Sequence, residues 1–183
     1  MANFLIVYAS RYGQTAKIAE ALANELARLG HDAWASDIGD VPEARGFDGV
    51  VLGAPVYQKR FPNEVRRWIE THRSALAGRP TAFFSVCLHV LESPRAAEEH
   101  ISRFLHAVHW QPNLATTFGG ALAYTRYGRI TRTLMKLVLR RMKGDVDTDR
   151  DYEYTDWEAV RSFARQFEKL HSESTRPSRK RAG

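Results

Sequence analysis

Residues 3–15 read NFLIVYASRYGQT, an apolar stretch that runs directly into a polar turn. Residues 4–7 are continuously apolar, as in a strand that is buried on both faces of a parallel sheet. Apolar residues then recur at the spacing of one helix face, at Ile18, Leu22, Leu26 and Leu29. A buried strand that passes at once into an amphipathic helix predicts an α/β protein, with this first turn at the carboxyl edge of the sheet.

That turn has the composition of a phosphate-binding loop. Two small hydroxyls surround one glycine in its six residues, Ser10, Arg11, Tyr12, Gly13, Gln14 and Thr15. A helix N-terminus offers unpaired backbone N–H groups and the positive end of the helix dipole, and this geometry binds phosphate. The chain has neither the Gly-Lys-Ser/Thr of a Walker loop nor the G-x-G-x-x-G of a dinucleotide fold. An ordinary strand-to-helix turn is the alternative.

The composition is that of one globular domain. The 183 residues are 44% hydrophobic and 26% charged, which is ordinary for a folded protein with a substantial core. The single cysteine, Cys87, excludes a disulfide framework and a cysteine-based metal cluster, and we predict no metal site. No apolar run approaches the ~18 residues that span a bilayer, and the early core strand leaves no room for a signal peptide. We therefore expect a cytoplasmic protein, with peripheral attachment to the inner face of the cell membrane left open.

Strand and helix patterns alternate along the chain. Strands are expected over residues 3–8, 32–36, 49–53, 81–87 and 116–123, and helices over 14–29, 63–72, 94–107 and 155–170. The last helix is predicted to begin at Thr155, because Thr155 and Glu158 have the spacing of a capping box. The alternation predicts a doubly wound, five-stranded parallel sheet in the order 2-1-3-4-5. Its ligand would lie at the carboxyl edge, among the loops that follow strands one, three, four and five.

The first turn resembles the phosphate loop of the flavodoxin family. In that family a hydroxyl residue, any residue, a second hydroxyl residue, Gly, any residue and Thr hold the phosphate of FMN. Ser10, Gly13 and Thr15 match, and Tyr12 stands where the second hydroxyl residue is common. The resemblance implies a flavodoxin-like sheet and FMN as the cofactor.

The resemblance also assigns the walls of the flavin site. Pro55, Val56 and Tyr57 look like the segment that flanks the flavin ring, and Tyr57 or Phe61 could stack on that ring. The alternative is a turn in which Tyr57 packs outward. Further contacts to the cofactor are expected after strands four and five, from Ser85, Val86, Cys87, Leu88 and Tyr124.

The net charge of +6 is unevenly distributed. Residues 126–143 contain seven basic residues and no acidic one. At 100° per residue, the apolar and basic side chains of residues 129–143 occupy opposite arcs, with only Arg141 on the apolar side, and this predicts a basic amphipathic helix between strand five and the last helix. Such a helix can lie in a membrane interface, and docking on its own domain is the alternative. We expect one domain over residues 1–172, with an insertion over about 124–154, and a basic disordered tail over 173–183.

Residues 119–160 resemble the C-terminal part of the flavodoxin-like, menaquinone-dependent protoporphyrinogen IX dehydrogenases. The shared motifs are GALAY at 120–124, Arg126-Tyr127, the basic helix, GDVDT at 144–148 and YTDWE at 154–158. The resemblance implies FMN-dependent oxidation of protoporphyrinogen IX to protoporphyrin IX in haem biosynthesis, with the electrons passed to a membrane quinone such as menaquinone. It implies contacts to the propionates of the substrate or to an anionic membrane surface from Arg126, Arg129, Arg132 and Lys136.

Two other functions fit a flavodoxin-like domain. One is a flavodoxin-type electron carrier, although such carriers tend to be acidic and this chain is basic. The other is an FMN-dependent NAD(P)H:quinone oxidoreductase. Nucleic-acid binding is not expected, because no recognisable reader motif accompanies the basic stretch. No catalytic acid or base is predicted, since the flavin carries the chemistry, and a homo-oligomer is left open.

Overall fold

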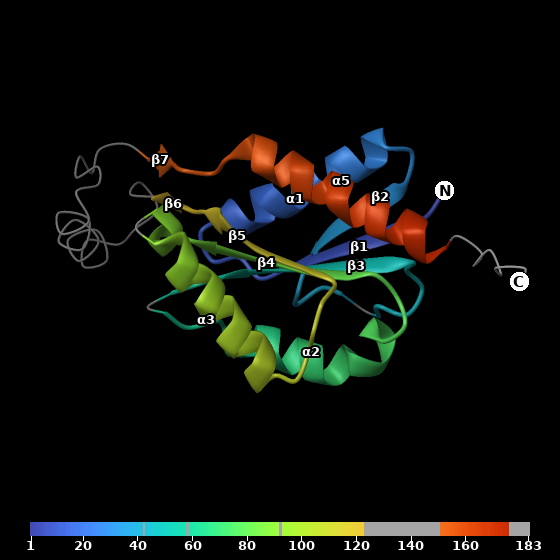
Figure 1. Cartoon of the computed structure of the whole chain (residues 1–183), viewed down its shortest axis with the longest axis horizontal. Coiled ribbons are helices and arrows are strands. Elements are labelled where there is room, and N and C mark those ends of the chain that lie inside the picture. The colour runs from blue at the N-terminus through green and yellow to red at the C-terminus, as the bar shows by residue number, and fades with distance from the viewer. Residues whose placement is uncertain (42, 58, 92, 123–150, 176–183) are drawn as a thin grey trace, which may run out of the picture.

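The computed structural model describes residues 1–175 apart from positions 42, 58, 92 and 123–150. A parallel sheet forms the middle of three layers (Figure 1). Helices α1 (Gln14–Arg28) and α5 (Trp157–Ser174) cover one face of this sheet, and α2 (Asn63–Leu76) and α3 (Pro94–Ala107) cover the other. The predicted basic helix and most of the predicted tail lie outside the described residues.

The sheet has five parallel strands in the order β2-β1-β3-β4-β5, as predicted. Their bounds are β1 Asn3–Tyr8, β2 Asp32–Asp37, β3 Gly49–Pro55, β4 Thr81–Cys87 and β5 Leu114–Gly119. A short 3-10 helix, η1 (Leu88–Leu91), follows β4. The register pairs Tyr8 with Gly53 and Cys87 with Gly119. The carboxyl ends of these four strands therefore finish along one edge.

The β1 strand is buried on both faces. Phe4 and Ile6 belong to the core beneath α1 and α5, whereas Leu5 and Val7 belong to the core beneath α2 and α3. All four side chains are almost completely buried, because the helical layers cover both sides of the sheet. This arrangement explains the continuous apolar run in the sequence.

Two of the helices, α2 and α5, extend further than their apolar periodicity predicts. Helix α2 continues to Leu76 and α5 continues to Ser174. The predicted inward residues of α5 are indeed buried, namely Val160, Phe163, Ala164 and Phe167. Over the described residues, no helix combines the length and the apolar character that crossing a bilayer requires.

The predicted fifth strand over residues 116–123 is wrong in its bounds. Strand β5 begins earlier and ends at Gly119, and β6 (Ala121–Leu122) pairs antiparallel with β7 (Tyr152–Glu153) in a separate two-stranded ribbon. The cause is a close approach of two backbones. A Cβ at Gly119 would lie 2.2 Å from the carbonyl oxygen of Tyr154, and the amide of Tyr154 donates a 3.0 Å hydrogen bond to the Gly120 carbonyl.

The predicted start of the last helix at Thr155 is also wrong. Asp156 is the N-cap of α5, and its carboxylate accepts hydrogen bonds from the amides of Glu158 (2.9 Å) and Ala159 (3.0 Å). Aspartate caps a helix as well as threonine does. The Thr155 hydroxyl donates instead to the carbonyl oxygen of Gly119, at 2.7 Å.

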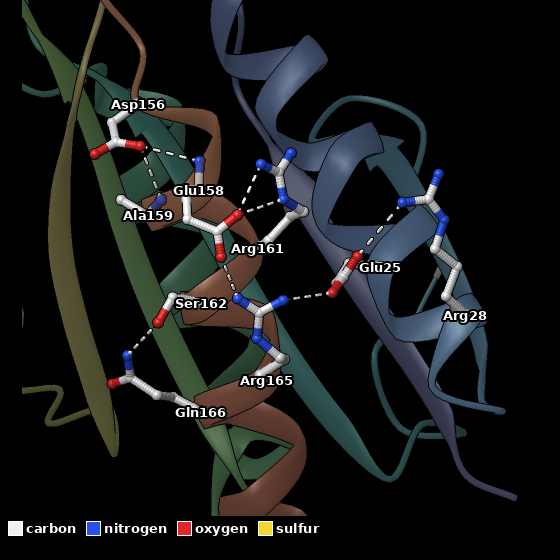
Figure 2. A network of polar contacts seen from close by, with 9 residues as sticks. All are labelled: Glu25, Arg28, Asp156, Glu158, Ala159, Arg161, Ser162, Arg165 and Gln166. Carbon is white, nitrogen blue, oxygen red and sulfur yellow. Dashed lines mark hydrogen bonds and ion pairs between the residues drawn. The ribbon is translucent and has the colours of Figure 1, made fainter.

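A charged network joins α1 to α5 (Figure 2). The largely buried carboxylate of Glu25 contacts Arg165 at 3.0 Å and Arg28 at 3.6 Å. Arg165 also reaches Glu158, which in turn binds Arg161 at 2.8 Å. Hydrogen bonds from Arg161 and then Arg165 lower the pKa of Glu158, and the hydrogen bond to Glu158 raises the pKa of Arg165. One arginine thus connects the two helices that cover this face.

Candidate functional site

The turn between β1 and α1 curls around the Ser10 side chain. The Ser10 hydroxyl oxygen accepts hydrogen bonds from the amides of Gly13 (3.1 Å) and Ala16 (3.4 Å). Gly13 is the N-cap of α1 with φ of 94°, a left-handed conformation that glycine adopts without strain. The amide of Ala9 donates to the carbonyl of Gly53 at 3.0 Å, which attaches the start of the turn to β3.

The first turn of α1 is open to an anion. Gln14 and Thr15 are buried, and no acidic residue lies in this turn. Within the described part of the chain, the backbone amides of Gln14 and Thr15 have no protein acceptor. Two free N–H groups at the positive end of a helix dipole, beside the Ser10 hydroxyl, are the donor set that a phosphate group requires.

A hydrogen-bond relay fixes this turn against β5. The Gln14 side-chain amide donates to the Thr155 hydroxyl at 2.8 Å, and that hydroxyl donates to the carbonyl of Gly119. The relay connects the turn after β1 with the end of β5 and the residue before the α5 cap. Nothing in the local sequence around Gln14 indicates this link, because its partner lies 141 positions away.

The loop after β3 forms a second wall. The amide of Val56 donates to the carbonyl of Val86 at 2.9 Å, which aligns this loop with the end of β4. The Tyr57 ring meets the Tyr12 ring edge to face, with centroids 5.8 Å apart, and the Arg11 guanidinium lies 5.5 Å from the Tyr12 centroid. Tyr12 therefore supports Tyr57 by ring contact at the position where the flavodoxin pattern commonly has a hydroxyl.

The side chains at the end of β4 are buried, so this strand would meet a ligand at the edge mainly through its backbone. Ser85 is buried, and its hydroxyl shares a 2.9 Å hydrogen bond with that of Thr117 in β5. Val86 and Cys87 are buried as well, and Leu88 begins η1. The Ser85 hydroxyl thus holds two strands together, and the chain turns out of the sheet directly after Cys87.

A cavity of about 350 Å³ lies at this edge. It brings together five residues named in the sequence analysis, Ser10, Arg11, Pro55, Tyr57 and Phe61, with Arg60, Pro62 and Glu64. Arg60 and Glu64 were not predicted as site residues, although their position just after Tyr57 indicates that they lie near the site. Phe61 lines this cavity but also packs its ring 4.2 Å from that of Phe104.

A larger cavity of about 710 Å³ lies at the opposite edge, beside Thr81 and Asn113. Its arginines are already engaged, since Arg73 binds the carbonyls of Val108 and His109 and Arg79 binds carbonyls of residues 44, 45 and 47. Parallel α/β sheets bind ligands at the carboxyl ends of their strands. The smaller cavity is therefore the candidate site.

Tyr8 ends β1 beside this site. Burial raises the pKa of its phenol, and the negative charges of Asp37, Glu20 and Asp40 raise it further. Both effects favour the neutral phenol over the phenolate. The predicted site residues Tyr124, Arg126, Arg129, Arg132 and Lys136 lie outside the described residues.

This chain is similar to known proteins in sequence and in fold. A family model of the flavodoxin domain matches residues 5–149. The protoporphyrinogen IX dehydrogenase (quinone) of Escherichia coli K12 is 33% identical over 177 residues, which cover 93% of this chain and 97% of that protein. The protein of the same name from Leishmania major is 30% identical over 174 residues, covering 91% of this chain and 74% of the relative.

The chain belongs to the protoporphyrinogen IX dehydrogenase family. Solved flavodoxins share the fold of this family member. Flavodoxin 1 of Bacillus cereus superposes with a TM-score of 0.58 at 19% identity, covering 92% of this chain and 98% of its own. A short-chain flavodoxin associated with a bacterial microcompartment gives 0.60 at 15% identity, with coverage of 93% and 99%.

The flavodoxin domain of this family indicates FMN as the cofactor. The described residues fit this cofactor, because the first turn of α1 presents free amides and no carboxylate at the position expected for the phosphate. The predictions of the family, the flavodoxin-like sheet and FMN are confirmed. The individual FMN contacts remain predictions.

Proposed function

We propose that the protein oxidises protoporphyrinogen IX to protoporphyrin IX, with FMN as cofactor and a quinone, such as menaquinone, as electron acceptor. One observation supports the proposal: a helix N-terminus with free amides and an adjoining cavity occur in a chain that aligns over 93% of its own length with the E. coli dehydrogenase. The reaction removes six hydrogen atoms from the substrate, as six electrons and six protons, in three two-electron steps. Bound FMN supplies this redox chemistry.

The chain's own residues hold and orient the cofactor. The amides of Gln14 and Thr15, with the hydroxyls of Ser10 and Thr15, would bind the phosphate. The left-handed Gly13 allows the backbone to approach it closely. The Gln14–Thr155–Gly119 relay attaches the turn to the end of β5. It would therefore hold the phosphate-binding amides at a fixed position relative to the loop after β5.

The loops after β3 and β4 would flank the flavin ring. Tyr57 is the stacking residue, and its edge-to-face contact with Tyr12 limits the orientations that its ring can adopt. Backbone groups of residues 86–88 follow β4 at the same edge and would meet the polar side of the ring. Pro55 and Val56 shape the turn between these two walls.

Residues 126–136 would contact the substrate or the membrane. Arg126, Arg129, Arg132 and Lys136 belong to a stretch without acidic residues, and arginine suits carboxylates such as propionates. The described strands on either side of residues 123–150, β6 and β7, pair with each other at the side of the domain where β5 ends. The same cations would attract the anionic surface of a membrane, where quinones reside.

The decisive experiment is anaerobic mixing of FMN-loaded protein with protoporphyrinogen IX. We expect the visible absorbance of the flavin to disappear and to return when a menaquinone analogue is added. Bleaching by NAD(P)H but not by protoporphyrinogen IX would instead favour an NAD(P)H:quinone oxidoreductase. Reduction only through a reductase protein would favour an electron carrier.

A deletion tests the role of the basic segment. Removing residues 128–143 should leave FMN stoichiometry unchanged, because the phosphate turn and its relay lie elsewhere in the chain. Quinone-coupled turnover should be lost. Undiminished turnover of the FMN-loaded deletion variant would contradict the proposed role of these cations.

A further inference from the structure

A second, basic cavity adjoins the flavin site. This basic groove has a volume of about 340 Å³ and lies between the start of α2 and α3. It is lined by Lys59, Arg60, Phe61, Pro62, Asn63, Arg66, His100, Arg103 and Phe104. Residues 60–62 line both this groove and the cavity that contains Ser10 and Tyr57. A ligand at the flavin site can therefore extend directly into the groove.

The groove carries positive charge that is not paired with a carboxylate within the part of the chain that the structure describes. Four of its lining residues are cations and none is acidic. Among the described residues, Lys59, Arg60, Arg66 and Arg103 form no ion pair with a carboxylate. Arg95 shows the contrast on the same helix, since it pairs with Glu99 at 3.3 Å. Clustered cations without counterions attract an anionic ligand.

The floor of the groove is apolar and firmly packed. The Phe61 ring stacks on the His100 ring with centroids 5.4 Å apart and planes 18° apart, and it also contacts Phe104. Phe61 rests in turn on the fully buried Phe83, at 5.6 Å. Cations above an aromatic floor suit an organic anion with a bulky apolar body better than a free inorganic anion.

The loop before α2 presents one cation at a strained position. Tyr57 and Arg60 exchange backbone hydrogen bonds of 3.0 and 2.9 Å, and Lys59 lies in the turn between them with φ of 61°. Glycine would adopt this left-handed conformation with less strain. Backbone strain alone would favour glycine at this position. The lysine found there instead places a positive charge at the mouth of the groove.

We propose that the basic groove binds the carboxylates of a tetrapyrrole dicarboxylate while its macrocycle lies against the flavin site. This inference rests on the proposed function, which supplies the tetrapyrrole. Arg66 and Arg103 approach from α2 and α3, and guanidinium groups pair with carboxylates through charge-assisted hydrogen bonds. The groove thereby orients the substrate. Its residues lie between positions 59 and 104 and are distinct from the basic segment 126–143.

The test compares two double variants of the FMN-loaded, full-length protein. Arg66→Gln with Arg103→Gln removes two exposed cations from the groove, and Arg67→Gln with Arg95→Gln removes two exposed cations from the same helices outside it. Both pairs change the net charge equally. We measure KM and kcat for protoporphyrinogen IX and for its uncharged dimethyl ester, and we measure binding of protoporphyrin IX by quenching of tryptophan fluorescence.

The groove variant should raise KM for protoporphyrinogen IX and weaken protoporphyrin IX binding, each about tenfold relative to the control variant, since two charge-assisted contacts are lost. Its kcat, its FMN content and its KM for the dimethyl ester should match those of the control. Equal KM and equal binding in the two variants would overturn the inference. So would an unchanged KM combined with weaker attachment of the groove variant to phosphatidylglycerol vesicles, which would assign these cations to lipid.

Failure of the proposed function has a different signature. A wild-type protein that does not oxidise protoporphyrinogen IX would overturn the proposed reaction. If that protein still bound protoporphyrin IX in the charge-dependent way described, the assignment of the groove to a tetrapyrrole dicarboxylate would stand.

Discussion

The side-chain amide of Gln14 donates a 2.8 Å hydrogen bond to the hydroxyl of Thr155, 141 positions further along the chain. Gln14 begins the helix that we propose receives the cofactor phosphate, and Thr155 directly precedes the cap of the last helix. The bond therefore transmits the position of the C-terminal helix to the phosphate turn. Stability and FMN affinity should depend on it together.

Thr155→Val should weaken both properties. The change removes the hydroxyl but keeps the side-chain volume, so the buried Gln14 amide loses its acceptor, at a cost of about 1–3 kcal/mol in unfolding free energy. Urea denaturation measures that cost, and quenching of flavin fluorescence measures the accompanying loss of FMN affinity. Thr175→Val, on an exposed hydroxyl at the end of α5, is the matched control and should leave both unchanged. Wild-type FMN affinity in Thr155→Val would show that the relay does not position the turn.

Gly119→Ala should separate β5 from the segment that follows β7. The new Cβ would lie 2.2 Å from the Tyr154 carbonyl oxygen, which is backbone and cannot rotate away. We expect a loss of about 1–3 kcal/mol in unfolding free energy, as for other overpacked sites. Gly46→Ala is the control, because no atom lies within 4 Å of a Cβ there. Equal stability of the two variants would contradict the close approach.

Asp37→Asn should lower the pKa of Tyr8 toward its ordinary value of 10.0. Burial is the largest cause of the raised pKa and stays in place, but the neighbouring negative charge is removed. Ultraviolet titration of tyrosinate, with Tyr8→Phe to identify the transition, measures the change. Because the folded pKa is raised, the contribution of Tyr8 to stability is present below pH 10 and is lost as the pH rises through the folded pKa. Asp32→Asn, at the other end of β2, should not move the titration.

Arg165→Gln should reduce stability in a pH-dependent way. The folded pKa of Glu158 lies below 4.5 because Arg161 and Arg165 donate hydrogen bonds to its carboxylate. The stabilisation is therefore present above pH 4.5 and is lost as the pH falls through the folded pKa. Urea denaturation should show a difference between wild type and Arg165→Gln that shrinks on acidification. Lys169→Gln, which removes an exposed cation from the same helix, should show a smaller difference at every pH.

Much of the fold could be predicted from local sequence. The bounds of β1, β4 and α3 agree with the expectation, because each combines a clear apolar pattern with a marked end. The turn between β1 and α1 was equally visible, since Ser10, Gly13 and Thr15 lie within six residues, and its binding of phosphate remains a prediction. The order of the strands followed from the regular alternation of strand and helix.

Features that depend on distant residues were not predictable in this way. The division between β5 and β6 depends on the close approach of the Tyr154 backbone to Gly119. Thr155 does not cap the last helix, because its hydroxyl donates a hydrogen bond to the Gly119 carbonyl. The basic groove was also not predictable from local sequence, because its residues come from separate parts of the chain. Lys59, Arg66 and Arg103 each read as an ordinary surface cation, and only the packing of α2 beside α3 brings them around one cavity.

Because β6 pairs with β7, Leu122 and Tyr152 are register partners although they flank residues 123–150 in the sequence. The entropy of closing a segment between two fixed ends grows only with the logarithm of its length, so that doubling the span between them would cost about 0.6 kcal/mol. Evolution or an engineer can therefore lengthen, shorten or exchange residues 123–150 without moving β5 relative to α5. A graft from a relative at this junction would test whether residues 123–150 determine the membrane or acceptor preference, because it leaves the flavin-binding body unaltered.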